Sequence, residues 1–435
     1  MESMPLNKIA GSKRVLSIVE KSGDLGYIIV LFYSVFILIS SFIFNTPREI
    51  AGGFYKLLLT PGILISDYMS VSNVGAAFFN SGFLMTVATV LARVYRLNMN
   101  GPLIAAIFTV GGFAFFGKNI FNITPILFGT FLYSVVKKES FGKFLLIALF
   151  GTALAPFVSQ LSFGYELPLL LGLFLGVVLG IAAGFILTPI AGHTVKFHQG
   201  FNIYNVGFTA GIIGTLFMAI LRGFGLDNEP VMLAAQGYNI TLGIYLTVMF
   251  LSMFTIGYIL NKGFKGYGNI LKKSGRLVTD FVSSDGLGLS LINMGALGLL
   301  STGYIVLIGG EINGPSIGGI FTIVGFAAFG KHLRNIMPIF IGVYLAAYFK
   351  IWEVNHTGAL LAALFGTTLA PIAGQFGWKI GILAGFLHMS LVMNVGYLHG
   401  GMNLYNNGFS GGILAVILVP VIFAFRKVDV GAKKE

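Results

Sequence analysis

The chain has 435 residues, of which 56% are hydrophobic and only 10% are charged, and its mean hydropathy is +0.89. A soluble domain has nearer a quarter of its residues charged, so the composition excludes an ordinary soluble protein and predicts an all-α polytopic membrane protein. The net charge of +12 comes from basic residues spread between apolar runs, which favours loops facing the cytoplasm over a nucleic-acid-binding patch. Cysteine is absent, which excludes disulfides and cysteine metal sites.

Residues 1–23 are polar and basic and lack a small-residue cleavage site, so they predict a cytoplasmic N-terminal tail rather than a cleaved signal peptide. We expect a first membrane repeat over 24–225, a second over 237–425 and a cytoplasmic C-terminal tail over 426–435. Each repeat contains about seven apolar runs of helical length. In chain order the predicted helices are 27–44, 74–91, 102–116, 124–136, 144–161, 167–190, 206–222, 240–260, 287–309, 314–329, 336–349, 358–374, 378–395 and 408–425.

Two stretches of nearly the same sequence indicate that the halves are a duplication. "NGPLIAAIFTVGGFAFFGKNIFNITPI" begins at Asn100, and "NGPSIGGIFTIVGFAAFGKHLRNIMPI" begins 213 residues later at Asn313. "FGTALAP" and "FGTTLAP" match further on, as do "HQGFNIYNVGFTAGI" and "HGGMNLYNNGFSGGI". Several matching segments in the same order predict an internal repeat. The stretch 52–66 and its counterpart "YGNILKKSGRLV" are read as interfacial helices.

Seven helices per repeat is an odd number, which predicts that the second repeat enters the membrane from the opposite side. Loop charge agrees with this inverted topology when both termini are cytoplasmic, since the expected inside loops hold most of the basic residues. The expected outside loops hold acidic residues and few bases. The basic exceptions are Arg48, Lys56, Lys118, Arg222 and Lys350.

The repeated stretch beginning at Asn100 contains two short helices separated by the polar linker 117–123, and the second copy is built in the same way. We expect a helix to begin at each of four prolines: Pro102, Pro125, Pro315 and Pro338. Proline has no backbone N–H, and the first turn of a helix does not need one for its hydrogen bonds. Paired short segments with Gly and Pro in inverted halves point to a central binding site. The pairs could be re-entrant hairpins or broken helices.

One candidate binding set therefore surrounds the two lysines of these breaks. An intramembrane lysine is costly and is expected to be functional, with neutral side chains as hydrogen-bonding partners. The set is Lys118, Asn119, Asn122, Lys331, His332 and Asn335. The alternative is that each lysine caps a helix C-terminus or extends to the headgroups.

A second candidate set lies in the repeated "YN" segments, whose Asn, Tyr and His side chains suit a neutral or weakly charged polar solute. Its members are His198, Asn202, Tyr204, Asn205, His399, Asn403, Tyr405 and Asn406. The alternative is a polar loop that caps the following helix. Asn80 and Asn293, inside apolar runs, are expected to make interhelical hydrogen bonds, and Asp67 and Asp280 are candidate caps.

Enzyme and cofactor motifs are lacking. "GGFAFFGKN" resembles a phosphate-binding loop, but Asn119 follows its lysine, and no His, Asp and Glu cluster has metal-ligand spacing. We therefore expect no cofactor, no catalytic residue and no bound metal.

The repeated signatures resemble an uncharacterised family of bacterial multi-pass membrane proteins, a domain of unknown function, which implies no activity. "FFNSG" at 78–82 and the Tyr204-Asn205 pair are also faintly similar to urea transporters, which have inverted halves as well. We expect a secondary transporter of a small polar or anionic solute in the cytoplasmic membrane, with H⁺ or Na⁺ as a coupling ion. The alternatives are a passive urea-like channel and a non-transport protein such as a lipid-processing enzyme. Its partners would be the bilayer and the solute but no nucleic acid, and a homo-oligomer is left open.

Overall fold

The computed structural model describes residues 6–425, and for residues 6–23 it describes the backbone alone. The described chain is almost entirely helical, and ten of its helices are long and apolar enough to cross a membrane. Four shorter apolar helices complete the predicted set: α5 (Gly101–Phe113), α6 (Ile120–Val136), α15 (Gly314–Phe326) and α16 (Leu333–Phe349). The predicted class, an all-α polytopic membrane protein, is confirmed.

The long helices match the predicted runs closely. In the first half they are α1 (Leu6–Phe44), α4 (Val74–Val94), α7 with α8 (Leu145–Gly151 and Ala155–Ser159), α9 (Leu169–Thr194) and α10 (Asn205–Gly223). In the second half they are α11 (Asn239–Asn261), α14 (Leu287–Leu307), α17 with α18 (Thr357–Gly366 and Ala370–Phe376), α19 (Trp378–Val395) and α20 (Asn406–Phe425). Helix α1 begins inside the segment 1–23, and the tail predicted over 426–435 lies outside the described residues.

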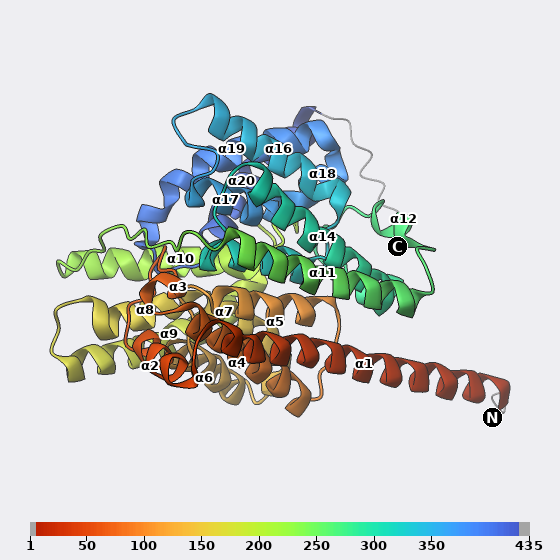
Figure 1. Cartoon of the computed structure of the whole chain (residues 1–435), viewed down its shortest axis with the longest axis horizontal. Coiled ribbons are helices and arrows are strands. Elements are labelled where there is room, and N and C mark those ends of the chain that lie inside the picture. The colour runs from red at the N-terminus through yellow and green to blue at the C-terminus, as the bar shows by residue number, and fades with distance from the viewer. Residues whose placement is uncertain (1–5, 426–435) are drawn as a thin grey trace.

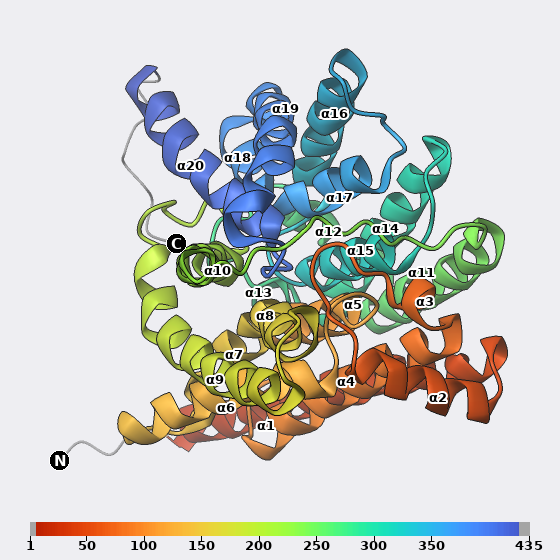
Figure 2. The same ribbon diagram turned by 90° about the vertical axis from the view of Figure 1, so that its left-hand side faces the viewer.

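Each half of the chain occupies its own half of the molecule (Figures 1 and 2), and equivalent helices pair in equivalent ways. α1 packs on α4 as α11 packs on α14, and α6 packs on α9 as α16 packs on α19. Helix α5 packs against α15 and α10 against α20, so these two pairs join the halves. A Cβ on Gly129 or Gly342 would lie 2.0 or 2.1 Å from a carbonyl oxygen of the neighbouring helix, so both positions require glycine for this close packing.

Two expectations about the short elements are corrected. Pro125 and Pro338 lie inside α6 and α16, which begin one turn earlier than predicted. Pro102 and Pro315 do lie in the first turns of their helices. The capped helix α2 (Pro47–Leu58) covers only the first part of the predicted interfacial segment 52–66 and begins before it, and the counterpart of that segment forms only the single turn α12 (Tyr267–Ile270). With three charged residues in "LKKSGR", that segment has no continuous apolar face to lie along a membrane surface.

Candidate functional site

The two helix breaks at the centre of the molecule are built alike. Gly117 and Gly330 have φ of +89° and +93°, a conformation that glycine adopts without strain. The Asn80 side chain donates hydrogen bonds of 2.7 Å to the carbonyls of Ala114 and Lys118. Its counterpart Asn293 donates equally short bonds to the carbonyls of Ala327 and Lys331. The two asparagines thus satisfy carbonyls that the breaks remove from helical hydrogen bonding.

The polar residues that follow each lysine stabilise the next helix and do not bind the lysine ammonium. Asn119 and Asn122 form a reciprocal cap at the start of α6. In α16 the His332 amide donates to Asn335, and the His332 ring contacts the carbonyl of Lys273. Asn122 and Asn335 also donate to the carbonyls of Gly117 and Gly330. The structure thus places these four predicted site residues beside the lysines, with their side chains bonded to backbone groups around the break, and Asn119 also donates to the carbonyl of Leu57 and the hydroxyl of Tyr68.

Lys118 and Lys331 are both completely buried, which rules out the alternative that they extend to the headgroups. The Lys118 ammonium lies 5.1 Å from the ring centre of Phe113 and 5.4 Å from that of Tyr405. The Lys331 ammonium lies 5.3 Å from the equivalent Phe326 ring and 4.5 Å from the Tyr204 ring. Each lysine thus meets one aromatic ring from its own half and one from the other.

The two ammonium groups differ in their hydrogen bonds. Lys331 Nζ donates to the Tyr204 hydroxyl and, at 2.6 Å, to Thr367 Oγ1. Among the described residues, Lys118 Nζ has no hydrogen-bond partner, and the buried hydroxyl of Tyr405 has only Thr109 as a polar neighbour, with no bond of ordinary geometry. The equivalent of Thr367 is Thr152, which donates to the carbonyl of Leu149. Thr367 was missed by sequence reasoning, although the repeated "FGT" motif marked its position.

Of the remaining members of the second predicted set, two asparagines link the halves, and each histidine pairs with an asparagine of its own half. Asn202 donates to the carbonyl of Gly408, and Asn403 donates to the carbonyl of Gly207. His198 bonds Asn205 at 2.9 Å, and His399 bonds Asn406 at 3.0 Å. Of this set, the structure brings only Tyr204 and Tyr405 to the lysines.

Two acidic residues add a second link between the halves. Asp67 accepts a hydrogen bond from the amide of Gly314 at the start of α15, and Asp280 accepts one from the amide of Gly101 at the start of α5. Each also caps its own short helix, as expected from the sequence. Asp67 lies outside the long apolar helices but is fully buried, and burial raises the pKa of its carboxyl to about 6 although three backbone amides donate to it. The carboxylates thus hold the N-terminus of each central short helix from the opposite half.

Two cavities, of about 510 and 350 Å³, lie against equivalent parts of the two halves. The larger is cavity 1 and the smaller is cavity 2. Pairs of residues related by the sequence repeat line them, with the member in cavity 1 given first: Phe365 and Phe150, Leu361 and Leu146, Leu404 and Ile203, Asn406 and Asn205, Phe116 and Phe329, Leu64 and Leu277.

Segments at opposite ends of α11 line the two cavities. Residues 228–232, which line cavity 1, precede α11, whereas Leu277 and Val278, which line cavity 2, follow it. Because α11 is long enough to cross the membrane, these segments belong to opposite ends of the bundle.

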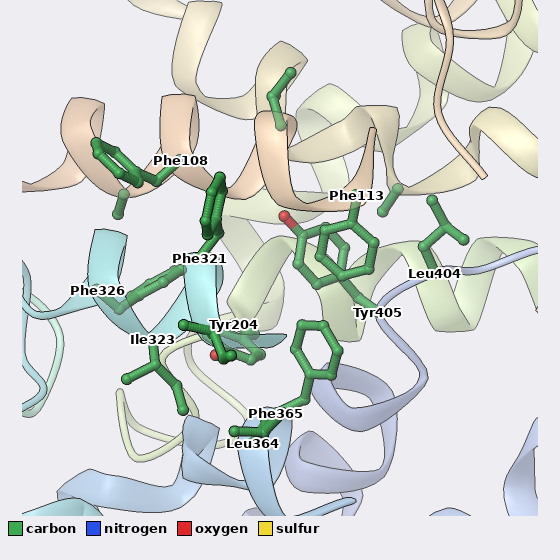
Figure 3. Packing of buried hydrophobic residues seen from close by; sticks show 14 of the residues in the cluster. Phe108, Phe113, Tyr204, Phe321, Ile323, Phe326, Leu364, Phe365, Leu404 and Tyr405 are labelled. Atoms are coloured by element: carbon green, nitrogen blue, oxygen red, sulfur yellow. The ribbon is translucent and has the colours of Figure 1, made fainter. Parts of the chain in front are cut away.

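Phe113, Phe326, Tyr204 and Tyr405 form a buried aromatic cluster, whose packing Figure 3 shows. Phe113 and Tyr405 have ring centres 4.6 Å apart, and the equivalent Phe326 and Tyr204 have ring centres 4.8 Å apart. The two tyrosine rings lie 6.0 Å from each other, so they join the two pairs into one cluster. The rings of this cluster are those that the two lysine ammonium groups contact.

Comparison with known proteins gives a family and no activity. No curated protein and no solved structure matches the chain, so the likeness to urea transporters gains no support. A family model described as "Protein of unknown function (DUF1576)" matches residues 46–223 and 259–424, which are most of the chain. The chain therefore belongs to this family of unknown function, as its repeated signatures predicted.

Proposed function

We propose that this protein is a secondary transporter that moves a small polar or anionic solute across the cytoplasmic membrane. The observation that carries the proposal is the pair of cavities lined by repeat-equivalent residues, at opposite ends of α11. Two halves of inverted orientation around a central site are the common architecture of alternating access, in which the site opens to one face at a time.

The aromatic cluster and the two lysines are the central site in this proposal. The cluster is fully packed in this conformation, since Phe113 and Phe326 are at most 1% exposed and the two tyrosines at most 3%. A solute in either cavity would meet this cluster before it could cross. Movement of one half against the other is therefore the proposed transport step, and a fixed open pore is disfavoured.

Loop charge supports the proposed orientation, with both termini in the cytoplasm. Lys262, Lys265, Lys272 and Lys273 follow α11 on the cavity 2 side, whereas Asp227 and Glu229 precede α11 on the cavity 1 side. Basic loops remain on the cytoplasmic side of a membrane. Cavity 2 would then face the cytoplasm and cavity 1 the exterior.

Cysteine labelling tests this orientation, since the natural chain has no cysteine and gives no background. Val278→Cys in cavity 2 and Met393→Cys in cavity 1 place single thiols at positions 78% and 36% exposed. A membrane-impermeant maleimide is expected to label Met393→Cys in intact cells and Val278→Cys only in inside-out vesicles. Labelling of both positions from the same side would contradict the opposed cavities.

Transport itself is tested by exchange in proteoliposomes loaded with a mixture of labelled carboxylates, amino acids, sugars, phosphate and urea. We expect saturable exchange of at least one small polar or anionic member, with a dependence on an imposed H⁺ or Na⁺ gradient if uptake is coupled. Non-saturating passage of urea alone would favour the channel. Exchange no faster than in protein-free liposomes would contradict transport.

A further inference from the structure

Two buried polar groups face each other where the break of the first half meets the second half. The Lys118 ammonium has no hydrogen-bond partner among the described residues, the Tyr405 hydroxyl has only Thr109 as a polar neighbour and no bond of ordinary geometry, and both side chains are at most 2% exposed. The ammonium lies 5.4 Å from the centre of the tyrosine ring. Their counterparts, Lys331 and Tyr204, are bonded to each other. Buried donors are normally hydrogen-bonded, and the equivalent pair in the other half is bonded. The unbonded pair therefore indicates a site that a ligand would complete.

The missing partner is an anion by its chemistry. The ion pairs of the described residues involve other groups, so no carboxylate of that part of the chain lies within ion-pair distance of Lys118. A charge buried without a partner is strongly unfavourable, and a ligand that supplies the opposite charge removes this penalty. Lysine and tyrosine can both donate to the same anionic group.

We propose that Lys118 and Tyr405 form an anion-binding site whose ligand is a small monocarboxylate with an apolar body. A carboxylate has two oxygens, which match one ammonium donor and one hydroxyl donor. The surroundings are aromatic and aliphatic: Phe113 packs on Phe365 and Phe116, and Leu404 adjoins Gly117. Such walls suit an apolar body and leave a phosphate or sulfate without enough donors.

The site lies between the two cavities: Tyr405 itself lines cavity 2, and the neighbours of Lys118 reach cavity 1. Phe116, Phe365 and Leu404 line that cavity, and Phe113 and Gly117, which contact them, flank Lys118 in space or in sequence. A carboxylate that enters cavity 1 therefore has this apolar wall between itself and the ammonium. The equivalent Lys331–Tyr204 pair is equally buried but is bonded to itself and so has no free donor pair for such a ligand. This inference rests on the proposed function only in assigning the ligand as the transported solute.

The test is a binding measurement on the purified full chain in detergent, with butyrate and benzoate as probes and butyramide, benzamide, sulfate and chloride as comparisons. Isothermal titration is expected to show saturable binding of the two carboxylates alone. Lys118→Met keeps the volume of the side chain and removes the charge, and Tyr405→Phe removes only the hydroxyl. Binding should be lost in the first variant and weakened about tenfold in the second, since both lose a charge-assisted hydrogen bond. Lys379→Gln, an exposed lysine, controls for net charge.

The assignment would be overturned if Lys118→Met bound the two carboxylates as tightly as the wild type does. It would also be overturned if the wild type bound butyramide or chloride as tightly as it binds butyrate. If the wild type exchanges a solute in proteoliposomes but binds neither carboxylate, the inference fails and the proposed function stands. If butyrate binds through Lys118 but no solute is exchanged, the site stands and the transporter fails.

Discussion

The helix break of the first half and that of the second half share a scaffold but differ in how their polar groups are satisfied. In both, an asparagine holds two carbonyls and a lysine is completely buried. Lys331 is bonded to Tyr204 and Thr367, whereas Lys118 and Tyr405 have no hydrogen bond of ordinary geometry among the described residues. Asp67 is buried where Asp280 is partly exposed. A duplicated sequence has thus produced one scaffold whose two copies differ in the hydrogen bonds of their buried polar groups.

The largest expected effect tests the shared scaffold. Asn80→Leu and Asn293→Leu each leave two buried carbonyls without their donor, at about 1–3 kcal/mol per group. Both variants should lower the free energy of unfolding in detergent by several kcal/mol. Asn293→Leu should be slightly the worse, because the Tyr267 hydroxyl also loses its acceptor. A large effect in one variant alone would break the equivalence of the two breaks.

A smaller effect tests the difference between the tyrosines. Tyr204→Phe deprives Lys331 of a partner and should cost about 1.5–3 kcal/mol of stability, the usual range for a hydrogen bond to a charged group. Tyr405→Phe removes a hydroxyl with no hydrogen bond of ordinary geometry in the described chain and should be neutral or slightly stabilising. Thermal unfolding of the two variants measures the contrast. Equal destabilisation would show that the asymmetry is absent in solution.

The smallest effect concerns pH and Asp67. Its pKa, raised to about 6 by burial, exceeds the ordinary value of 3.8, so between these values the folded state binds a proton that the unfolded state does not. Stability from this group therefore increases as pH falls from 7 to 5, with the sign given by proton linkage. The wild type should gain melting temperature relative to Asp67→Asn over this range. A constant difference between them would contradict the burial of the carboxyl.

Reading the sequence identified the helices well because length and apolarity alone define a membrane span. It placed the starts of α6 and α16 too late, because it took Pro125 and Pro338 as first-turn residues. Asn119 caps α6, and Asn335 accepts a hydrogen bond from the amide of His332, the residue before α16, so both helices begin earlier in the chain and the prolines fall inside them. Asn119, Asn122 and Asn335 remain predicted site residues that also make hydrogen bonds at the helix starts, because a polar residue beside a buried lysine has the same appearance in sequence whether it binds a ligand or caps a helix.

The sequence by itself determined the membrane class, the duplication, the two breaks and the identity of the paired lysines, because these depend on hydropathy, spacing and repetition along the chain. Only the tertiary structure decided which groups meet across the halves. Tyr204 lies 127 residues from Lys331 and Asp67 lies 247 residues from Gly314, and each contact exists only because the halves interlock. The unequal state of Lys118 and Lys331 is likewise invisible in two nearly identical motifs, because Lys331 bonds Tyr204 of the other half and Thr367 of its own, whereas Lys118 bonds neither equivalent residue.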